Sequence, residues 1–122
     1  MRPSSYQLRI FCRDTLEVAA LLGVSIDVEA GDFLDTCFIL TREIAEDGPY
    51  IDHIAGFLAL LDGKFADLGE LGISRSDISI WLLRTYRDQC NMEFAPQTLL
   101  HLGEEGLALC VSCWQESGEA RT

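Results

Sequence analysis

The feature that most constrains the fold is an apolar stripe in the middle of the chain. Six apolar residues recur at alternating steps of three and four: Ile51, Ile54, Leu58, Leu61, Phe65 and Leu68. This spacing predicts one face of a helix over residues 49–71, with Pro49 suited to the first helical position. Gly56 and Gly63 weaken such a helix intrinsically. We therefore expect it to depend on packing against other elements, and Gly63 to mark a bend or a break.

Four other segments have the alternation or the β-branched and aromatic content of strands, at residues 6–12, 36–41, 78–85 and 107–114. Two shorter helices are expected between them. Asp14 to Glu17 has the form of a capping box, and Gly23 is placed to end the first helix. The second opens at Pro96 and stops at Gly103 or Gly106.

The predicted element order is β-α-β, a long helix, then β-α-β. If each half forms a right-handed crossover, the two halves are structural duplicates within a ferredoxin-like variant. We therefore predict an α+β fold with a four-stranded, mainly antiparallel sheet and helices on one face. The 122 residues fit a single domain over 1–116, followed by a polar tail at 117–122.

The charge of the chain restricts its partners. Nine basic and twenty acidic residues give a formal net charge of −11 at pH 7. Nucleic-acid phosphates and anionic membranes are repelled by such a molecule, whereas a basic protein is attracted to it. We predict no nucleic-acid partner and no membrane partner. Solubility alone is the other explanation of the charge.

The opening residues, the apolar runs and the cysteines together predict the cellular compartment. The opening residues lack the apolar core of a secretory signal, and the longest apolar run, 54–61, is too short to cross a bilayer. The five cysteines are an odd number in a chain that has enough apolar residues for a core, so a disulfide framework is not indicated. A cytoplasmic location fits best.

Carboxylates are concentrated in one segment, where Arg42 is the single basic residue. They are Asp27, Glu29, Asp32, Asp35, Glu43, Glu46 and Asp47. A basic partner would meet this segment first, so these residues are predicted to bind it. The calcium-loop pattern of an EF-hand is not present. A solvated acidic loop is the alternative.

A second candidate surface follows from alternation along the predicted strands. The side chains opposite the core face include Arg9, Phe11, Trp81 and Trp114. Aromatic residues and arginine are enriched at interface hot spots, so this open sheet face is predicted to bind a partner. Alternatively, the long helix or a second copy of the chain covers it, the latter giving a homodimer. Stacking of RNA bases is a weaker alternative that the charge opposes.

The sequence contains no catalytic or metal-binding motif with the required spacing. Cys110 and Cys113 are three apart on a predicted strand, so they point to opposite faces. Pairing of His53 with Cys37 or Cys90 would require a tertiary contact. No phosphate loop, nucleophile elbow or zinc-helix motif occurs in the sequence. We expect no enzyme activity, no cofactor and no metal.

Several short segments resemble those of a bacterial protein family that is known only as a domain of unknown function. They are Leu8-Arg9-Ile10, Leu21-Leu22-Gly23-Val24, Gln89-Cys90-Asn91-Met92-Glu93-Phe94 and the stretch from Leu99 to Cys113-Trp114. Phe38 stands where members often carry tryptophan. The family implies no catalytic residues, and small acidic proteins of this kind are similar to immunity proteins that occlude a toxin. We therefore expect an immunity protein with a basic toxin partner; the alternative is a housekeeping module that self-associates or binds a small ligand.

Overall fold

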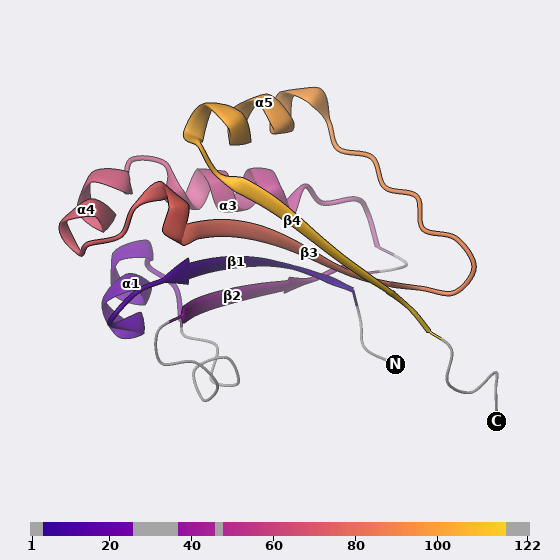
Figure 1. Cartoon of the computed structure of the whole chain (residues 1–122), viewed down its shortest axis with the longest axis horizontal. Coiled ribbons are helices and arrows are strands. Elements are labelled where there is room, and N and C mark those ends of the chain that lie inside the picture. Colours follow the sequence, from indigo (N-terminus) through magenta and orange to yellow (C-terminus); the bar gives the residue numbers. More distant parts are fainter. Residues whose placement is uncertain (1–3, 26–36, 46–47, 117–122) are drawn as a thin grey trace.

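The computed structural model describes residues 4–25, 37–45 and 48–116. The strands and helices are shown in Figure 1. They are β1 (Ser5–Phe11), α1 (Thr15–Leu22), β2 (Cys37–Glu43), α3 (His53–Leu61), α4 (Phe65–Glu70), the 3-10 turn η1 (Arg75–Asp77), β3 (Ile78–Tyr86), α5 (Pro96–Glu105) and β4 (Ala108–Gln115). The predicted strands agree with these bounds to within about two residues, the usual uncertainty of strand ends.

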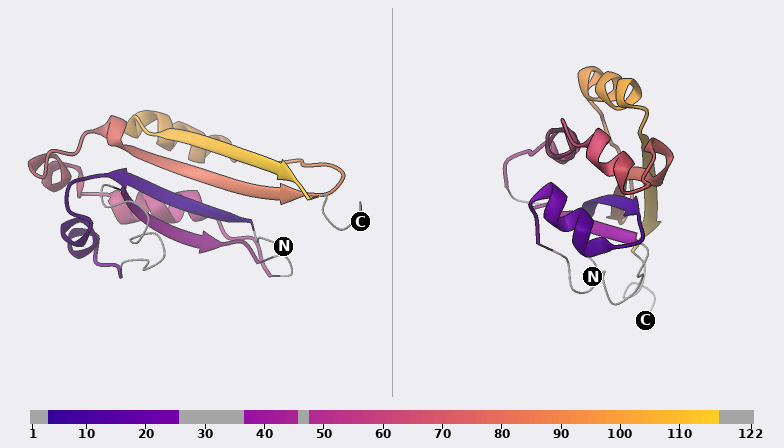
Figure 2. Two further views of the ribbon diagram at one scale, coloured as in Figure 1. Left: turned by 60° about the horizontal axis from the view of Figure 1, so that its bottom comes forward. Right: turned by 90° about the vertical axis from the view of Figure 1, so that its left-hand side faces the viewer.

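The strands form one four-stranded sheet in the order β2-β1-β3-β4. Figure 2 shows them side by side. β1 runs antiparallel to both β2 and β3, and β4 runs parallel to β3. The apolar residues of α1, α3, α4 and α5 all join the core on the same sheet face. The predicted α+β fold, with a mainly antiparallel sheet and helices on one face, is confirmed.

The prediction that the two halves of the chain are structural duplicates is wrong. β3, α5 and β4 form a parallel crossover, but β1 and β2 are antiparallel neighbours. Cys37, which opens β2, pairs with Phe11, which closes β1. The chain therefore re-enters the sheet at the end it left, with α1 inside the connection. A ferredoxin-like sheet would need a crossover there as well.

The shorter helices begin and end at the predicted residues. The Asp14 carboxylate accepts hydrogen bonds from the backbone N–H groups of Leu16 and Glu17, at 2.9 and 3.2 Å. Gly23 and Gly106 end α1 and α5 in the left-handed region, each with a φ of 73°. Glycine adopts this conformation without the steric cost of a Cβ atom, which explains the two stops.

The long helix predicted over residues 49–71 is two helices. Gly63 lies between α3 and α4 with a φ of 77°, which ends the first helix, so the predicted break is confirmed. The predicted start at Pro49 is wrong. Asp52 caps α3 by accepting from the N–H of Ala55 at 3.0 Å, and the helix begins one residue later. Ile51 consequently lies outside the helix and is 56% exposed.

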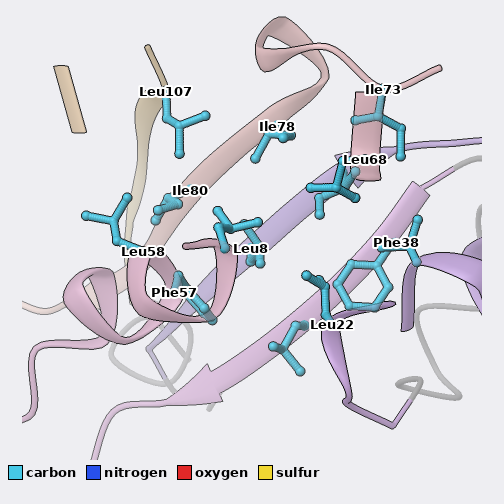
Figure 3. Packing of buried hydrophobic residues seen from close by; sticks show 14 of the residues in the cluster. Leu8, Leu22, Phe38, Phe57, Leu58, Leu68, Ile73, Ile78, Ile80 and Leu107 are labelled. Carbon is cyan, nitrogen blue, oxygen red and sulfur yellow. The ribbon is translucent and has the colours of Figure 1, made fainter. Parts of the chain in front are cut away.

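The core fills the space between the helices and one face of the sheet (Figure 3). Leu8, Ile10 and Ile80 at its centre have no exposed surface. The helical residues packed on them include Val18, Leu22, Phe57, Leu58, Leu61, Leu68 and Leu102. Burying a side chain of this size contributes roughly 1.5–3 kcal/mol. Packing therefore holds α3 despite its internal Gly56, as the sequence predicts.

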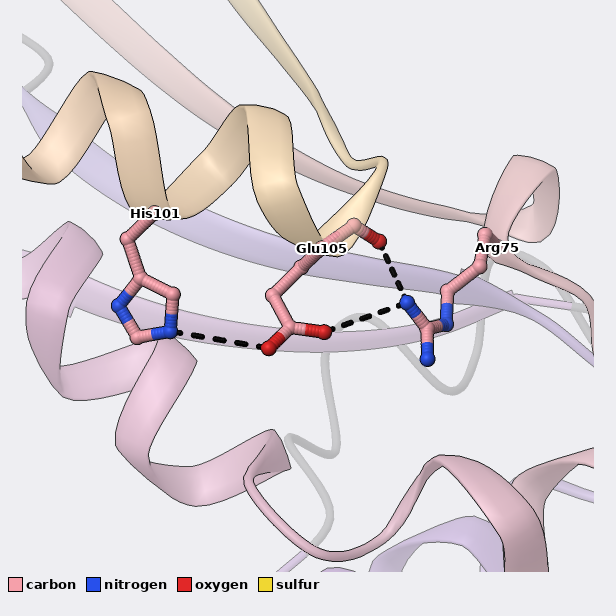
Figure 4. A network of polar contacts seen from close by, with 3 residues as sticks. All are labelled: Arg75, His101 and Glu105. Carbon is pink, nitrogen blue, oxygen red and sulfur yellow. Dashed lines mark hydrogen bonds and ion pairs between the residues drawn. The ribbon is translucent and has the colours of Figure 1, made fainter.

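A surface network around Arg75 ties α5 to η1, as Figure 4 shows, and also reaches α4. The Arg75 guanidinium donates to the backbone carbonyl of Glu105 at 2.6 Å and contacts the Glu105 carboxylate at 3.2 Å. Glu105 also lies 3.8 Å from His101, one turn earlier in α5. The same guanidinium stacks on the Phe65 ring at 3.6 Å. The hydrogen bond from Arg75 gives a partner to the Glu105 carbonyl, one of the last backbone oxygens of α5, which have no partner within the helix.

Candidate binding surface

The sheet has a second face, opposite the core, on which none of the described helices packs. Leu8 and Ile10 point into the core, so Arg9 and Phe11 point away from it, as alternation requires. Strand register carries this face across the sheet. Arg9 lies opposite Ile39 on β2 and Ser79 on β3.

The face continues onto the edge strand β4. Trp81 lies beside Cys110, and Thr85 lies beside Trp114. The structure therefore places all four residues of the predicted aromatic surface, Arg9, Phe11, Trp81 and Trp114, on one face. This part of the sequence prediction agrees with the described register.

A connected set of contacts fixes the centre of the face. The Arg9 guanidinium lies 4.2 Å from the centroid of the Trp81 ring, and its Nε donates to Gln7 Oε1 at 2.8 Å. Gln7 Nε2 in turn donates to Thr41 Oγ1 at 3.3 Å. The Trp81 indole N–H donates to Ser79 Oγ at 2.9 Å. The arginine and the tryptophan are thus held in single orientations before any partner arrives.

The charge of Arg9 is retained in this environment. Burial lowers the pKa of its guanidinium, and Cys37 and Cys110 act in the opposite direction. An arginine begins from a value so high that it stays protonated at neutral pH. The face therefore presents a positive charge at its centre, positioned over an aromatic ring.

Exposure differs across the face. Phe11 is 57% exposed, whereas Trp81 and Trp114 are partly buried. Phe11 also lines a surface groove of about 550 Å³ between the end of β1 and the chain after α4. Its other lining residues are Cys12, Arg13, Glu70, Leu71, Gly72 and Ile73. Phe11 is thus the most accessible apolar side chain of the predicted set.

Sequence reasoning missed the polar residues that support the aromatic ones. Gln7, Thr41 and Ser79 hold Arg9 and Trp81 in place. Their contacts depend on register, because Gln7 meets Thr41 only when β1 and β2 pair with this offset. A period-two pattern assigns a side chain to a face but does not give the pairing offset. No signal in the single sequence could have identified this network.

The acidic set of predicted residues is placed only in part. Glu43 is exposed at the end of β2, where it lies opposite Ser5. The other six, Asp27, Glu29, Asp32, Asp35, Glu46 and Asp47, lie outside the described residues. Cys37 comes two residues after Asp35 in the sequence and pairs with Phe11.

The cysteine–histidine pair considered from sequence does not form at Cys37. Cys37 pairs with Phe11 at one end of β2, on the open side. His53 instead contacts Tyr6, with ring centroids 5.7 Å apart, and Tyr6 pairs with Arg42 near the other end of β2. Five residues of strand separate the two positions, which is about 16 Å.

His53 and Tyr6 occupy a partly buried site on the helix side of the sheet. Burial lowers the pKa of the His53 imidazole, helped by Arg42 and opposed by Asp52. Burial raises the pKa of the Tyr6 phenol, with Tyr50 and Asp52 acting in the same direction. Both groups are therefore held in their neutral forms, as expected for side chains that pack against each other where α3 begins.

The described residues offer neither a cluster of metal ligands nor a helix that could span a membrane. Histidine, cysteine and carboxylate side chains do not gather there in any group of three or more that could hold a metal ion. In the same part of the chain, none of the helices has both the length and the apolar character needed to cross a bilayer.

Comparison with protein-family models, with curated proteins and with solved structures found no match to this chain. The resemblance to a family of unknown function therefore stays a prediction. The open sheet face, with its fixed Arg9–Trp81 centre, is the candidate site on which a functional proposal can rest.

Proposed function

We propose that this chain is a binding protein of the bacterial cytosol, and specifically an immunity protein that neutralises a basic toxin domain by covering it. The observation that carries the proposal is the open sheet face, where a fixed arginine–tryptophan pair lies near an exposed phenylalanine. Such residues supply most of the binding energy in protein interfaces.

Rigidity favours this face as a binding surface. Ordering a long side chain on association costs roughly 0.5–1.5 kcal/mol. Arg9 is already held by Gln7 and by the Trp81 ring, so much of this cost is met when the chain folds. Trp81 is held in turn by Ser79. A partner would therefore find the central contact residues in place, which favours affinity.

Charge supports the choice of a basic partner. The net charge of −11 would attract a basic domain over a distance of roughly a Debye length, about 8 Å at physiological salt. Toxins that attack nucleic acids carry basic surfaces because their substrates are polyanions. Glu43 and the acidic segment that precedes Cys37 would guide this domain toward the aromatic face. The inhibition would be steric occlusion, with no chemistry performed on the toxin.

The proposal is tested by capture and then by mutation. The tagged chain is recovered from its native cell lysate at low salt, and the co-purifying protein is identified. The proposal expects a basic protein, released by raising the salt, whose toxicity on expression is relieved by this chain. Recovery of an acidic partner, or of a basic partner whose toxicity persists, contradicts it.

Phe11→Ser should weaken binding of this partner by roughly tenfold or more, as expected for truncation of an interface hot spot. Leu100→Ser is the matched control, because Leu100 is 61% exposed but lies on α5, on the helix side of the sheet. Calorimetric titration measures both affinities, and circular dichroism checks that both variants fold. Equal losses for the two variants would remove the open face from the proposal.

Self-association is the alternative function, and one feature of β4 favours it. Residues 108–115 form an edge strand without a charged residue or a proline. Edge strands usually carry such residues, which prevent pairing with another chain. Light scattering over a dilution series distinguishes the two functions. A dimer stable at micromolar concentration, with no loss of scattering mass on dilution, would favour the self-associating module.

A further inference from the structure

Two cysteines that are far apart in the sequence have adjacent thiols. Cys90 lies in the long connection between β3 and α5, which Figure 1 shows looping beyond the end of the sheet. Cys113 lies on β4, 23 residues later, and the two Sγ atoms are 4.0 Å apart. Both are free thiols in this structure.

The chain on either side of the pair is anchored. The backbone N–H of Glu116 donates to the carbonyl of Tyr86 at 2.7 Å. The Gln115 side chain donates to the carbonyl of Arg87, also at 2.7 Å. These bonds fix the end of β4 against the start of the connection, a few residues from each cysteine. The closeness of the two thiols is therefore a property of the fold in this region.

The two thiols differ in access. Cys113 is exposed, whereas Cys90 is partly buried. Cys113 lies beside Arg84 in the parallel β3–β4 pair. Desolvation raises the pKa of the Cys113 thiol, Cys90 raises it further, and Arg84 acts in the opposite direction. A reagent in solution would reach Cys113 first, and would react with it faster as the pH rises.

We propose that Cys90 and Cys113 form a reversible disulfide that pins the β3–α5 connection to β4 when the chain meets a low-molecular-weight disulfide such as oxidised glutathione. A disulfide brings its sulfur atoms to about 2.05 Å, so the two Sγ atoms must approach by about 2 Å. Rotation of the exposed Cys113 side chain and a small shift of the connection supply this movement.

The exchange proceeds in two steps that balance. The Cys113 thiolate attacks one sulfur of the small disulfide; that S–S bond breaks, a mixed disulfide forms and one small thiolate leaves. The Cys90 thiolate then attacks the Cys113 sulfur and releases the second small thiol. The protein loses two protons and two electrons, and the small disulfide takes them up to give two thiols.

The other cysteines are differently placed. Cys110 lies on the open face beside Trp81. Burial raises the pKa of the Cys12 thiol, and Cys37 lies close enough to raise it further, but Cys37 is only 3% exposed. A bulky disulfide reagent would reach that pair poorly. The exchange should therefore be selective for Cys90 and Cys113.

The test treats the full chain with oxidised glutathione and measures its intact mass. Wild type should lose about 2 Da, and peptide mapping should place the new bond between Cys90 and Cys113. Cys90→Ser should stop at the mixed disulfide on Cys113, because the resolving thiol is absent. Cys110→Ser is the control, and should behave as wild type.

Limited proteolysis supplies a second readout. Trypsin cleavage after Arg87 should slow by roughly threefold or more in the oxidised wild type, because local opening of the connection becomes restricted. Reduction should restore the original rate, and Cys113→Ser should show no change on oxidation. A disulfide mapped to Cys12 and Cys37, a mixed disulfide that persists in wild type, or no mass change would overturn the proposal.

Discussion

Single side chains in this molecule often serve two elements at once. Asp52 caps α3 through one carboxylate oxygen and accepts from the Thr98 hydroxyl of α5 through the other, at 3.0 Å each. Arg75 joins η1 to α5 and stacks on α4. Such residues add polar contacts between helices that also pack through the apolar core. Their loss should therefore cost more than the loss of an ordinary surface charge.

Asp52→Ala should lower the free energy of unfolding by about 1–3 kcal/mol, since it removes a helix cap and a hydrogen bond between helices. Asp62→Ala is the control, because Asp62 is an exposed aspartate at the other end of the same helix. Its effect should stay within roughly 0.5 kcal/mol. Urea unfolding of both variants measures the difference, and equal losses would show that Asp52 is not the connecting residue.

His53 should make stability depend on pH. Its pKa is lowered in the folded chain, so the neutral imidazole is the form that the fold prefers. The contribution is fully present above the unfolded pKa of about 6.5, declines below that value and is lost once the pH has fallen through the lower folded pKa. Thermal unfolding between pH 7.5 and 5.5 should show this decline, and His53→Gln should flatten it. An unchanged slope in the variant would assign the pH dependence to other groups.

The helices and strands were largely predictable because each carries a local signal. Asp14, Gly23, Gly63 and Gly106 mark helix ends through the chemistry of caps and of positive φ, which acts within a few residues. The start of α3 was not predicted, because Asp52 competes with Pro49 as the first residue and its cap involves a contact with Thr98 on a distant helix. The direction of β2 was missed for a similar reason. Alternation is the same for parallel and antiparallel neighbours.

Two glycines of the central region should respond to alanine with opposite signs. Gly63→Ala should destabilise the chain by about 1 kcal/mol, because Gly63 has a φ of 77° where a Cβ atom is strained. Gly56→Ala should stabilise it by up to about 1 kcal/mol, because Gly56 lies inside α3 with open space around it. Chemical denaturation measures both. Destabilisation by Gly56→Ala would mean that α3 packs more closely there than described.

At the scale of the molecule, the candidate site combines a predictable part with an unpredictable one. Alternation placed Arg9, Phe11, Trp81 and Trp114 on one face, and the described register agrees. The contacts that orient Arg9 required the strand order and the offset, which no single sequence specifies. The acidic residues were found by composition, which reports how much charge a segment has. Composition does not report how that charge is arranged around a partner.

Neutralising the acidic segment tests the electrostatic part of the proposed function. Replacing Asp32, Asp35, Glu46 and Asp47 together with serine should weaken partner binding by roughly tenfold at low salt and flatten its salt dependence. A control variant changes the same number of exposed carboxylates on the helix side, away from the Phe11 groove: Glu17, Asp62, Asp67 and Glu104. Binding kinetics of both variants, measured at several salt concentrations, distinguish the effect of the acidic segment from that of the net charge. Equal effects would assign the attraction to net charge alone, and unchanged binding would remove the acidic segment from the proposal.

The parallel pairing of β3 with β4 has a consequence for the order in which the sheet is completed during synthesis. β4 is the last described strand to leave the ribosome, and it can join β3 only after the crossover through α5 has been made. Until then β3 has β1 on one side and a bare edge on the other. That strand, Ile-Ser-Ile-Trp-Leu-Leu-Arg-Thr-Tyr, is among the most apolar of the chain. Nascent chains that stop short of β4 therefore expose this edge, and should aggregate more readily and bind chaperones more strongly than chains that include β4.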